Sequence, residues 1–385
     1  MFTFELRNHF YSDMKIIIVG TAYPYRGGLA NYNERLARQF SNEGHDVEIW
    51  TFTLQYPSFL FPGKTQYSNS PAPSDLRITR CVHSCNPLNW LKVGHQLRRM
   101  APDLLIIKFW LPFMAPCFGT IARIARKNGK TRVISILDNI IPHEKRIGDH
   151  AFAKYFVGAV DGFVAMSESV LNDVRTFDDR KPKAFCPHPL YDNFGATLSR
   201  EEALTRLGLD TSYRYLLFFG LIRDYKGLDL LLDALALSRD KLGKTKLIVA
   251  GEFYNNGDQY AQQCERLNLQ DLIVWHTEFV PDEEVCNYFC AADLIVQPYK
   301  SATQSGVTQI AYHFERPMLV TDVGGLAEIV PDGRCGYVVS PNAESIATAL
   351  TSFCTTDNTQ TFQQGLQEEK KKYAWDKMTE AILGL

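Results

Sequence analysis

Two basic residues stand three positions apart in a short loop that opens a helix. Arg223 and Lys226 lie in GLIRDYKGLDLLL, directly after the apolar run YLLFFG. Two cations at this spacing can converge on one phosphate group, and a helix N-terminus adds its positive dipole. Charged loop residues are usually solvated, but the buried strand before them and the glycines on either side favour a ligand. The loop therefore predicts an anion site.

A second segment offers neutral donors for the same chemistry. QPYKSATQSGVTQIAYHF reads as a strand end, a loop and a helix start. Its hydroxyl, amide and backbone donors are Thr303, Gln304, Ser305 and Gly306. Such a set can cradle phosphate oxygens, although Ser and Thr also favour helix N-caps without any ligand. Gln309 is expected to lie off the apolar face of the helix that follows.

The first half of the chain has two further candidates at strand ends. Gly27 and Gly28, in TAYPYRGGLANY, precede a helix and could let the backbone approach an anion, or could form a plain turn. Asp138, in SILDNIIPHEKR, could accept a proton or hold a sugar hydroxyl, or could start an Asx turn with Asn139. The glycine pair is not a GxGxxG fingerprint, which disfavours a dinucleotide-dependent oxidoreductase.

Short apolar runs alternate with helical segments along the whole chain. KIIIVG, DVEIWTF, LLIIKFW, RVISIL and GFVAM form one series, and YLLFFG, KLIVAG, LIVWH, LIVQPY, PMLVTD and GYVVS form another. This succession predicts parallel sheets covered on both faces, so the fold class is α/β with two doubly wound Rossmann-like domains. Ligands are then expected at the carboxyl ends of the strands, in a cleft that the domains share. The predicted domains are 14–192 and 212–366, joined by the helix-prone segment 197–213, and a last helix over about 367–385 returns to the first domain.

Composition fits an ordinary globular protein of this kind. Of 385 residues, 45% are hydrophobic and 22% are charged. Residues 1–190 carry 24 Lys and Arg against 16 Asp and Glu, whereas residues 191–385 carry 17 against 27. This basic half lacks the density of a nucleic-acid binder, so no nucleic-acid partner is expected. The nine cysteines are interpreted as free thiols in a reducing compartment, with a metal site at Cys81, His83 and Cys85 as the minor alternative.

Signals for export or membrane insertion are not expected. The N-terminus has no continuous apolar core, and residues 1–13 are interpreted as a disordered leader or an upstream start before Met14. The most membrane-like stretch, Leu104 to Ala122, contains a lysine and two prolines, so a strand followed by a helix fits it better. The predicted location is the cytoplasm.

In their order, these signals resemble those of the family 4 retaining glycosyltransferases, which have the GT-B fold. The resemblance runs from Met14 to the last helix. It is carried by the glycine pair, NEGHDVEIWT, GLIRDYKGLDLLLDA, AGEF, FVPDEEV, AADLIVQPY and RPMLVTDVGGLAEIVPDGRCGYVV. It implies transfer of a sugar from a nucleotide-diphosphate donor, held by the second domain, to a glycan or lipid-linked acceptor held mainly by the first. It implies no metal and no cofactor.

Site roles follow from the resemblance residue by residue. Arg223 and Lys226 match the basic pair that binds the donor diphosphate, and they would also be catalytic because they stabilise the leaving group. Gly28, with Gly27 beside it, matches the loop that approaches the donor. Glu284 lies in the segment near the nucleoside.

Departures from the family pattern are expected to alter donor recognition. Where most members carry two glutamates, this chain has Ala302 and Ile310. It is similar to a subgroup in which TQSG meets the phosphates, with Gln309 as the nearest candidate for a ribose contact. Asp138, the third predicted catalytic residue, stands where many members have a histidine. A sugar-nucleotide epimerase and an inactive sugar-nucleotide-binding module remain alternatives.

A basic stripe raises the question of membrane contact. Arg123, Arg126, Lys127 and Lys130 recur at helical spacing, and YPSFLFPG (56–63) adds aromatics. One interpretation is a solvated helix face beside a packed loop. The other is a weak, salt-sensitive dock on the anionic inner face of the cell membrane, where a lipid-linked acceptor would be found.

Overall fold

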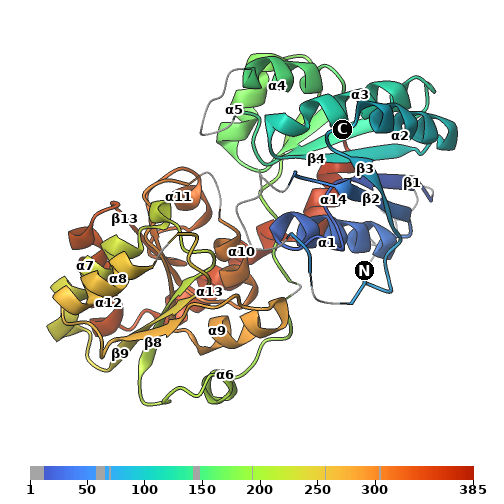
Figure 1. Ribbon diagram of the computed structural model, residues 1–385. Helices are drawn as coiled ribbons and strands as arrows, with labels where there is room; N and C mark the ends of the chain where they lie inside the picture. The colour runs from blue at the N-terminus through green and yellow to red at the C-terminus, as the bar shows by residue number, and fades with distance from the viewer. Residues whose placement is uncertain are drawn as a thin grey trace. The chain divides into compact units, whose positions relative to one another are not determined.

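The computed structural model describes residues 13–57, 66–68, 71–141, 148–192, 194–255, 257–302 and 305–385. The chain folds into two compact units (Figure 1). The first holds the chain up to His188 together with Trp375–Leu385, and the second holds Pro189–Ala374. Both are built on parallel sheets, so the predicted α/β class with two Rossmann-like domains is confirmed. The predicted leader falls outside the described residues, apart from Asp13.

The first unit contains seven described strands in the order β3-β2-β1-β4-β5-β6-β7, all paired in parallel. Its strands are β1 (Lys15–Val19), β2 (Asp46–Leu54), β3 (Ile78–His83), β4 (Leu104–Phe109), β5 (Arg132–Leu137), β6 (Gly162–Ala165) and β7 (Lys183–Phe185). Its helices are α1 (Gly28–Asn42), α2 (Pro87–Met100), α3 (Ala115–Arg126) with the 3-10 turn η2 (Pro112–Met114) before it, α4 (Asp149–Val157), α5 (Glu168–Phe177) and α14 (Trp375–Leu383).

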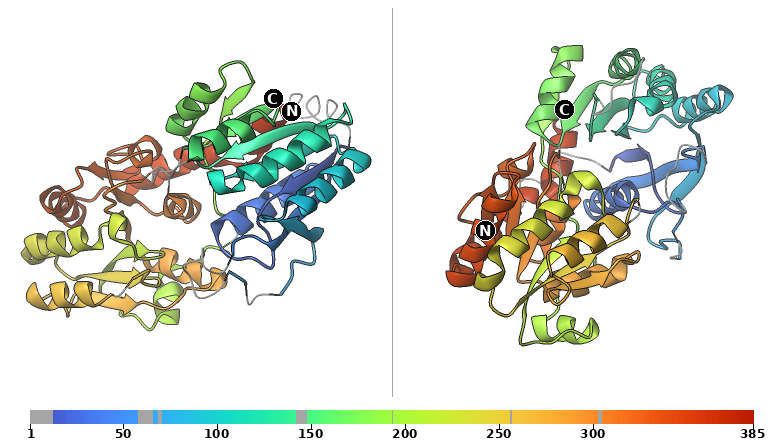
Figure 2. Two further views of the ribbon diagram at one scale, coloured as in Figure 1. Left: turned by 45° about the horizontal axis from the view of Figure 1, so that its top comes forward. Right: turned by 60° about the vertical axis from the view of Figure 1, so that its left-hand side comes forward.

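Side-chain alternation along the buried strands builds a core on each face of this sheet. Ile17 and Val19 of β1 pack with α2, α3, α4 and α5, whereas Ile16 and Ile18 pack with α1 and α14. Figure 2 shows the helices on both sides of the sheet. Because both faces are covered, the central strands read as continuous apolar runs, which is why the sequence reveals them.

The second unit contains six described strands in the order β10-β9-β8-β11-β12-β13, again all parallel. Its strands are β8 (Arg214–Phe219), β9 (Thr245–Ala250), β10 (Ile273–His276), β11 (Leu294–Gln297), β12 (Met318–Thr321) and β13 (Gly336–Val339). Its helices are α6 (Arg200–Arg206), α7 (Leu228–Ser238), α8 (Asp258–Arg266), α9 (Val285–Ala291), α10 (Gly306–His313), α11 (Leu326–Ile329), α12 (Ala343–Thr355) and α13 (Thr359–Glu369). The 3-10 turns are η3 (Asp224–Lys226), η4 (Arg239–Lys241), η5 (Asp282–Glu284) and η6 (Lys370–Tyr373).

The strand order of each unit places a switch point beside its first strand. β1 lies between β2 and β4, and β8 lies between β9 and β11, so successive connections leave in opposite directions. In open parallel sheets the ligand crevice lies outside the carboxyl ends of the strands at this point. The glycine pair follows β1, and the RDYKG loop follows β8. The topology therefore puts both predicted anion sites where such sheets bind ligands.

The end of the chain differs from the expected single helix. α13 and η6 belong to the second unit, Ala374 takes an extended conformation, and α14 belongs to the first unit. Tyr373 packs against Tyr312, with ring centroids 5.0 Å apart, whereas Trp375 packs against Tyr32 at 5.1 Å. Ala374 separates Tyr373, which packs in the core of the second unit, from Trp375, which packs in the core of the first. α14 packs on the first unit, as predicted for the last helix.

The stretch Leu104 to Ala122 forms β4, η2 and the start of α3, as predicted. Over the described parts of the chain, we find no helix with the length and apolar character that a membrane span requires.

Candidate functional site

The loop after β8 holds the predicted cation pair by means of its glycines. It turns at Gly220, whose φ of 94° favours glycine, and η3 ends at Gly227 in the left-handed conformation. A Cβ at Gly220 would lie only 3.0 Å from the Nζ of Lys226. Lys226 Nζ donates to the carbonyl oxygen of Phe219 at 3.4 Å, at the end of β8. The lysine therefore lies under the loop, against the strand end.

Lys226 is a buried cation that forms no ion pair with any described residue. Its side chain is 8% exposed. Burial, followed by the charge of Arg223, lowers its pKa from 10.5 to about 8. The neighbouring Asp224 pairs with Lys300 at 3.2 Å. A bound anion near Lys226 would offset both its burial and its repulsion by Arg223, since the anion supplies an opposite charge.

Arg223 is positioned by the loop that follows β9. The amide of Ile222 donates to the carbonyl of Glu252 at 2.7 Å, and the amide of Tyr254 donates to the carbonyl of Ile222 at 2.9 Å. These bonds bring the Arg223 guanidinium to 3.9 Å from the centre of the Tyr254 ring. Its Nε is buried and has no hydrogen-bond partner among the described residues. Sequence reasoning missed Tyr254, because no spacing links it to Arg223.

The start of α10 lies beside this loop, as the phosphate-cradle prediction requires. Ser305 is the N-cap of α10, yet its side chain makes no capping hydrogen bond. Its hydroxyl lies 3.3 Å from the hydroxyl of Tyr299 instead, and the Tyr299 ring centre lies 5.7 Å from Lys226 Nζ. Gly306 starts the helix. Thr303 and Gln304 lie outside the described residues.

Gln309 differs from its expected position, because α10 is buried on all sides. Its side chain is 1% exposed, and neither its amide nitrogen nor its amide oxygen has a partner among the described residues. The neighbouring Thr308 donates to Gln297 Oε1 at 3.1 Å. Ile310, where most family members have a glutamate, belongs to the hydrophobic core. Of Gln309 and Ile310, only Gln309 has polar side-chain atoms that could contact a ligand.

Glu284 belongs to the second unit as well. It ends η5, after the edge strand β10, and its side chain is exposed. Within the described chain, no hydrogen bond or ion pair joins it to Arg223 or Lys226. The assignment of Glu284 to the nucleoside stays a prediction.

In the first unit, the glycine pair forms an open helix start. Gly27 has a φ of 99° and is the N-cap of α1, with no atom within 4 Å of the place where a Cβ would lie. Gly27 and Gly28 are exposed, and the first turn of α1 has no acidic residue. A 15-residue helix with an exposed N-terminus favours an anion there.

Asp138 follows β5 and is paired with a lysine that sequence reasoning missed. Its Oδ1 accepts a hydrogen bond from Lys108 Nζ at 2.9 Å. The lysine side chain is 2% exposed and that of Asp138 is 23% exposed. The same Nζ lies 3.4 Å from the centre of the Tyr32 ring. Burial lowers the pKa of Lys108, while Asp138 acts in the opposite direction.

The signal for Lys108 was present in the sequence. It is the one charged residue in LLIIKFW, a run already interpreted as a buried strand. A buried ammonium requires a partner, and a carboxylate at the end of the neighbouring strand is the obvious candidate. His143 and Glu144, which follow Asp138 in the sequence, lie outside the described residues.

Across the described ranges, no three His, Cys, Asp or Glu side chains gather closely enough to hold an ion, and all nine cysteines are free.

Comparisons with known proteins agree with the fold and the order of motifs. The family model described as Glycosyltransferase Family 4 matches residues 26–184, and that described as Glycosyl transferases group 1 matches residues 213–356. A D-inositol 3-phosphate glycosyltransferase from Frankia alni is 26% identical over 346 residues, which cover 82% of each chain.

Solved structures share the architecture at low identity. A glycosyltransferase from Rickettsia africae superposes with a TM-score of 0.72 at 17% identity, over 97% of this chain and 98% of that one. HepE from Anabaena, solved with UDP and glucose, gives a TM-score of 0.72 at 16% identity, over 97% and 100%. This likeness confirms the predicted GT-B fold. The two family models, one on each unit, together span most of the chain and support a glycosyltransferase of family 4.

Proposed function

We propose that the chain is a retaining glycosyltransferase that takes its sugar from a nucleotide-diphosphate donor held by the second unit. The observation that carries this proposal is the cation pair of the RDYKG loop. Arg223 and Lys226 lie side by side at a strand end, and neither forms an ion pair with a described residue. Two adjacent cations without a counter-charge are destabilised until an anion binds, and a diphosphate supplies two phosphate groups.

The remaining donor contacts follow from the position of α10. The N-terminal amides of the helix and the hydroxyl of Ser305 would meet the phosphates, with Thr303, Gln304 and Gly306 beside them. Gln309 would contact the ribose, because its buried amide has no other partner among the described residues. Glu284 is assigned to the nucleoside on the family resemblance alone. The TQSG segment would thus replace the glutamate pair of most members.

The chemistry would be electrostatic. When the bond between the sugar and the diphosphate breaks, negative charge develops on the leaving phosphate, and preorganised cations and amides stabilise it. Removal of one such charged group should raise the barrier by about 2–4 kcal/mol, or roughly 30- to 1000-fold in rate. We expect no metal ion and no cofactor to be required.

The first unit would hold the acceptor. The open N-terminus of α1 at Gly27 and Gly28 suits a phosphate or sugar hydroxyl. Asp138 Oδ1 is held by Lys108, and within the described residues Oδ2 has no hydrogen-bond partner. That second oxygen can therefore accept a hydrogen bond from a hydroxyl of the reacting sugar or the acceptor.

Relatives support the donor class and a place in glycan assembly. HepE was solved with UDP and with UDP-glucose, and structural neighbours include WaaG, a glycosyltransferase of lipopolysaccharide biosynthesis. We propose a hexose donor and a glycan or lipid-linked acceptor, in polysaccharide or glycolipid assembly in the cytoplasm.

The proposal includes peripheral contact with an anionic membrane through the basic stripe. Arg123 donates to the carbonyl of Tyr155, Arg126 pairs with Asp161 at 2.5 Å, and Lys130 pairs with Asp103 at 2.9 Å. Among these four basic residues, Lys127 is the one whose side chain the described structure leaves unengaged. Most of the stripe thus has a structural role, and the aromatic loop falls largely outside the described residues.

The decisive experiment is product analysis with UDP-, GDP- and ADP-sugars, with and without glycan or lipid-linked acceptors. We expect acceptor-dependent release of the nucleoside diphosphate, a product with the anomeric configuration of the donor, and no effect of EDTA. A changed sugar without any acceptor would indicate an epimerase. Nucleotide binding without turnover on any acceptor class would indicate a binding module.

A further inference from the structure

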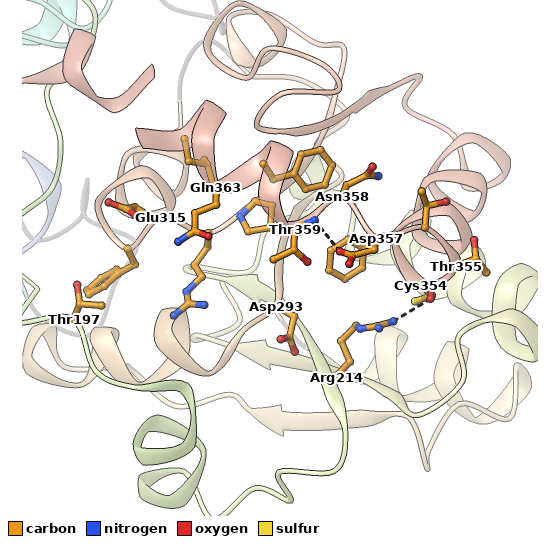
Figure 3. A pocket seen from close by; sticks show the side chains of 17 residues that line it. Thr197, Arg214, Asp293, Glu315, Cys354, Thr355, Asp357, Asn358, Thr359 and Gln363 are labelled. Carbon is orange, nitrogen blue, oxygen red and sulfur yellow. Dashed lines mark hydrogen bonds between the residues drawn. The ribbon is translucent and has the colours of Figure 1, made fainter. Parts of the chain in front are cut away.

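A cavity of about 820 Å³ lies at the amino-terminal ends of the strands of the second unit. The RDYKG loop lies at their carboxyl-terminal ends. Its lining includes Arg214, the first residue of β8, and Pro317, which directly precedes β12. In a parallel sheet these amino ends face away from the carboxyl ends, where Arg223 and Ser305 stand. Neither of those residues lines the cavity (Figure 3). We call it the amino-edge cavity.

The carboxylates of the amino-edge cavity are already occupied. Asp293 accepts hydrogen bonds from the Arg200 guanidinium, at 2.9 and 2.8 Å. Glu315 is bound by Lys370 and by the side-chain amide of Gln367. Asp357 accepts the amide of Thr359 at 3.1 Å, drawn as a dashed line in Figure 3. Asp293 and Glu315 therefore each have a cation partner outside the lining, while the charge of Arg316 also acts on Glu315.

Two arginines of the cavity form no ion pair with a described residue. Arg214 donates to the carbonyl of Cys354 at 3.4 Å, and its guanidinium lies 5.5 Å from the centre of the Phe353 ring. The Nε of Arg316 is buried without a hydrogen-bond partner within the described chain. A buried guanidinium N–H without an acceptor is costly, and the planar guanidinium suits a phosphate with two parallel hydrogen bonds.

The rest of the lining adds donors and an apolar wall. α13 begins at Thr359, its N-cap Asn358 makes no side-chain capping bond, and its first turn has no acidic residue. The carboxylate of Asp357, which accepts the Thr359 amide, offsets the positive potential of this helix end. Phe314, Phe353 and Phe362 also line the cavity; Phe353 is partly exposed, and the other two are buried. The volume is that of a pocket for a small organic molecule rather than for a single ion.

We propose that the amino-edge cavity binds a small organic phosphate. Its phosphate group would contact Arg214 and Arg316, and its ring or apolar part would lie against the phenylalanines. This site is separate from the donor site, so its ligand would not compete with a nucleotide. The proposal stands whether or not the donor assignment is correct.

Calorimetric titration with phenyl phosphate tests the proposal. The probe carries a phosphate and one aromatic ring, so it matches both halves of the lining. The titration uses the full chain with Arg223→Gln and Lys226→Met, which removes phosphate binding at the RDYKG loop. We expect binding in this background, and a decrease in its affinity of at least about tenfold on adding Arg316→Gln or Arg214→Gln. Arg266→Gln, on the exposed face of α8, is the charge-matched control and should change nothing.

A second readout locates the ligand. Cys354 lines the cavity and is partly exposed, whereas Cys85 is an exposed cysteine of the first unit. Phenyl phosphate should slow maleimide labelling of Cys354, measured by peptide mass spectrometry, and leave Cys85 unchanged. The proposal is overturned by the absence of binding, by equal affinity in a folded Arg316→Gln or Arg214→Gln variant, or by binding that leaves Cys354 labelling unaffected.

Discussion

Replacing Lys226 with methionine should stabilise the ligand-free protein while weakening nucleotide binding. The folded-state pKa of Lys226 is about 8, against 10.5 for an ordinary lysine. At 1.36 kcal/mol per pKa unit, burial of the charged form destabilises the fold at neutral pH by about 3 kcal/mol. Methionine fills a similar volume without the charge. The substitution removes the long hydrogen bond to the carbonyl of Phe219, so we expect a net gain of about 1–3 kcal/mol.

The sign of the pH dependence provides a sharper test than the magnitude. Below pH 8 the lysine is protonated in both the folded and the unfolded state, so the full destabilisation is present. Between about pH 8 and 10.5 the unfolded state binds more protons than the folded state, and wild-type stability rises with pH. The stability advantage of Lys226→Met should therefore be constant below pH 8 and disappear towards pH 10.5.

Scanning calorimetry of the ligand-free proteins measures this effect. A gain of 1–3 kcal/mol corresponds to an increase in Tm of roughly 2–12 °C for a domain of this size. Lys241→Met, at an exposed position of η4, is the matched control and should leave Tm unchanged. The reasoning is refuted if Lys226→Met lowers Tm at pH 7, or if its advantage is the same at pH 7 and pH 10.

Three further predictions concern other residues of the two units. Asp138→Asn should decrease sugar transfer at least about 30-fold while nucleotide affinity in calorimetry stays within about twofold, and transfer at the wild-type rate would leave Asp138 as a turn residue only. Gln309→Leu should keep or raise stability by about 1 kcal/mol in urea unfolding, because two buried amide atoms without partners are removed, and should weaken nucleotide binding about tenfold; unchanged affinity would refute the ribose contact. Trp375→Ala should destabilise the first unit by about 3–5 kcal/mol in the same assay, since its buried ring packs on Tyr32; a decrease below about 1 kcal/mol would show that α14 contributes little.

The strands that sequence reasoning found and missed differ in length and apolar character. Every predicted apolar run forms a strand, including β10 and β13 at the edges of the second sheet. β3 and β7 were missed, and both lie at the edges of the first sheet. β3 reads ITRCVH and buries one residue fully, while β7 has only three residues. These two edge strands have no continuous apolar run, so their sequences resemble loops, whereas the edge strands β10 and β13 have such runs and could be predicted.

Only those residues of the candidate site that lie next to a recognisable strand end or helix start could be predicted from the sequence. Arg223 and Lys226 could be found because a strand, a glycine turn and a helix start are all local signals. Tyr254 could not, since it reaches Arg223 through backbone pairing between the loops after β8 and β9. The burial of Gln309 was missed because α10 packs on every side, which amphipathic periodicity does not predict.

Calorimetric titration of UDP, GDP and ADP into wild type, Arg223→Gln/Lys226→Met and the Arg266→Gln control tests the donor site most directly. At least one nucleotide should bind wild type and the control equally, and its affinity should fall at least about 100-fold in the double variant, because that variant cannot form two charge-assisted hydrogen bonds to the phosphates. Circular dichroism confirms that each variant is folded. Equal affinity in the double variant, or no binding of any nucleotide to wild type, would contradict the assignment of this loop to the donor diphosphate.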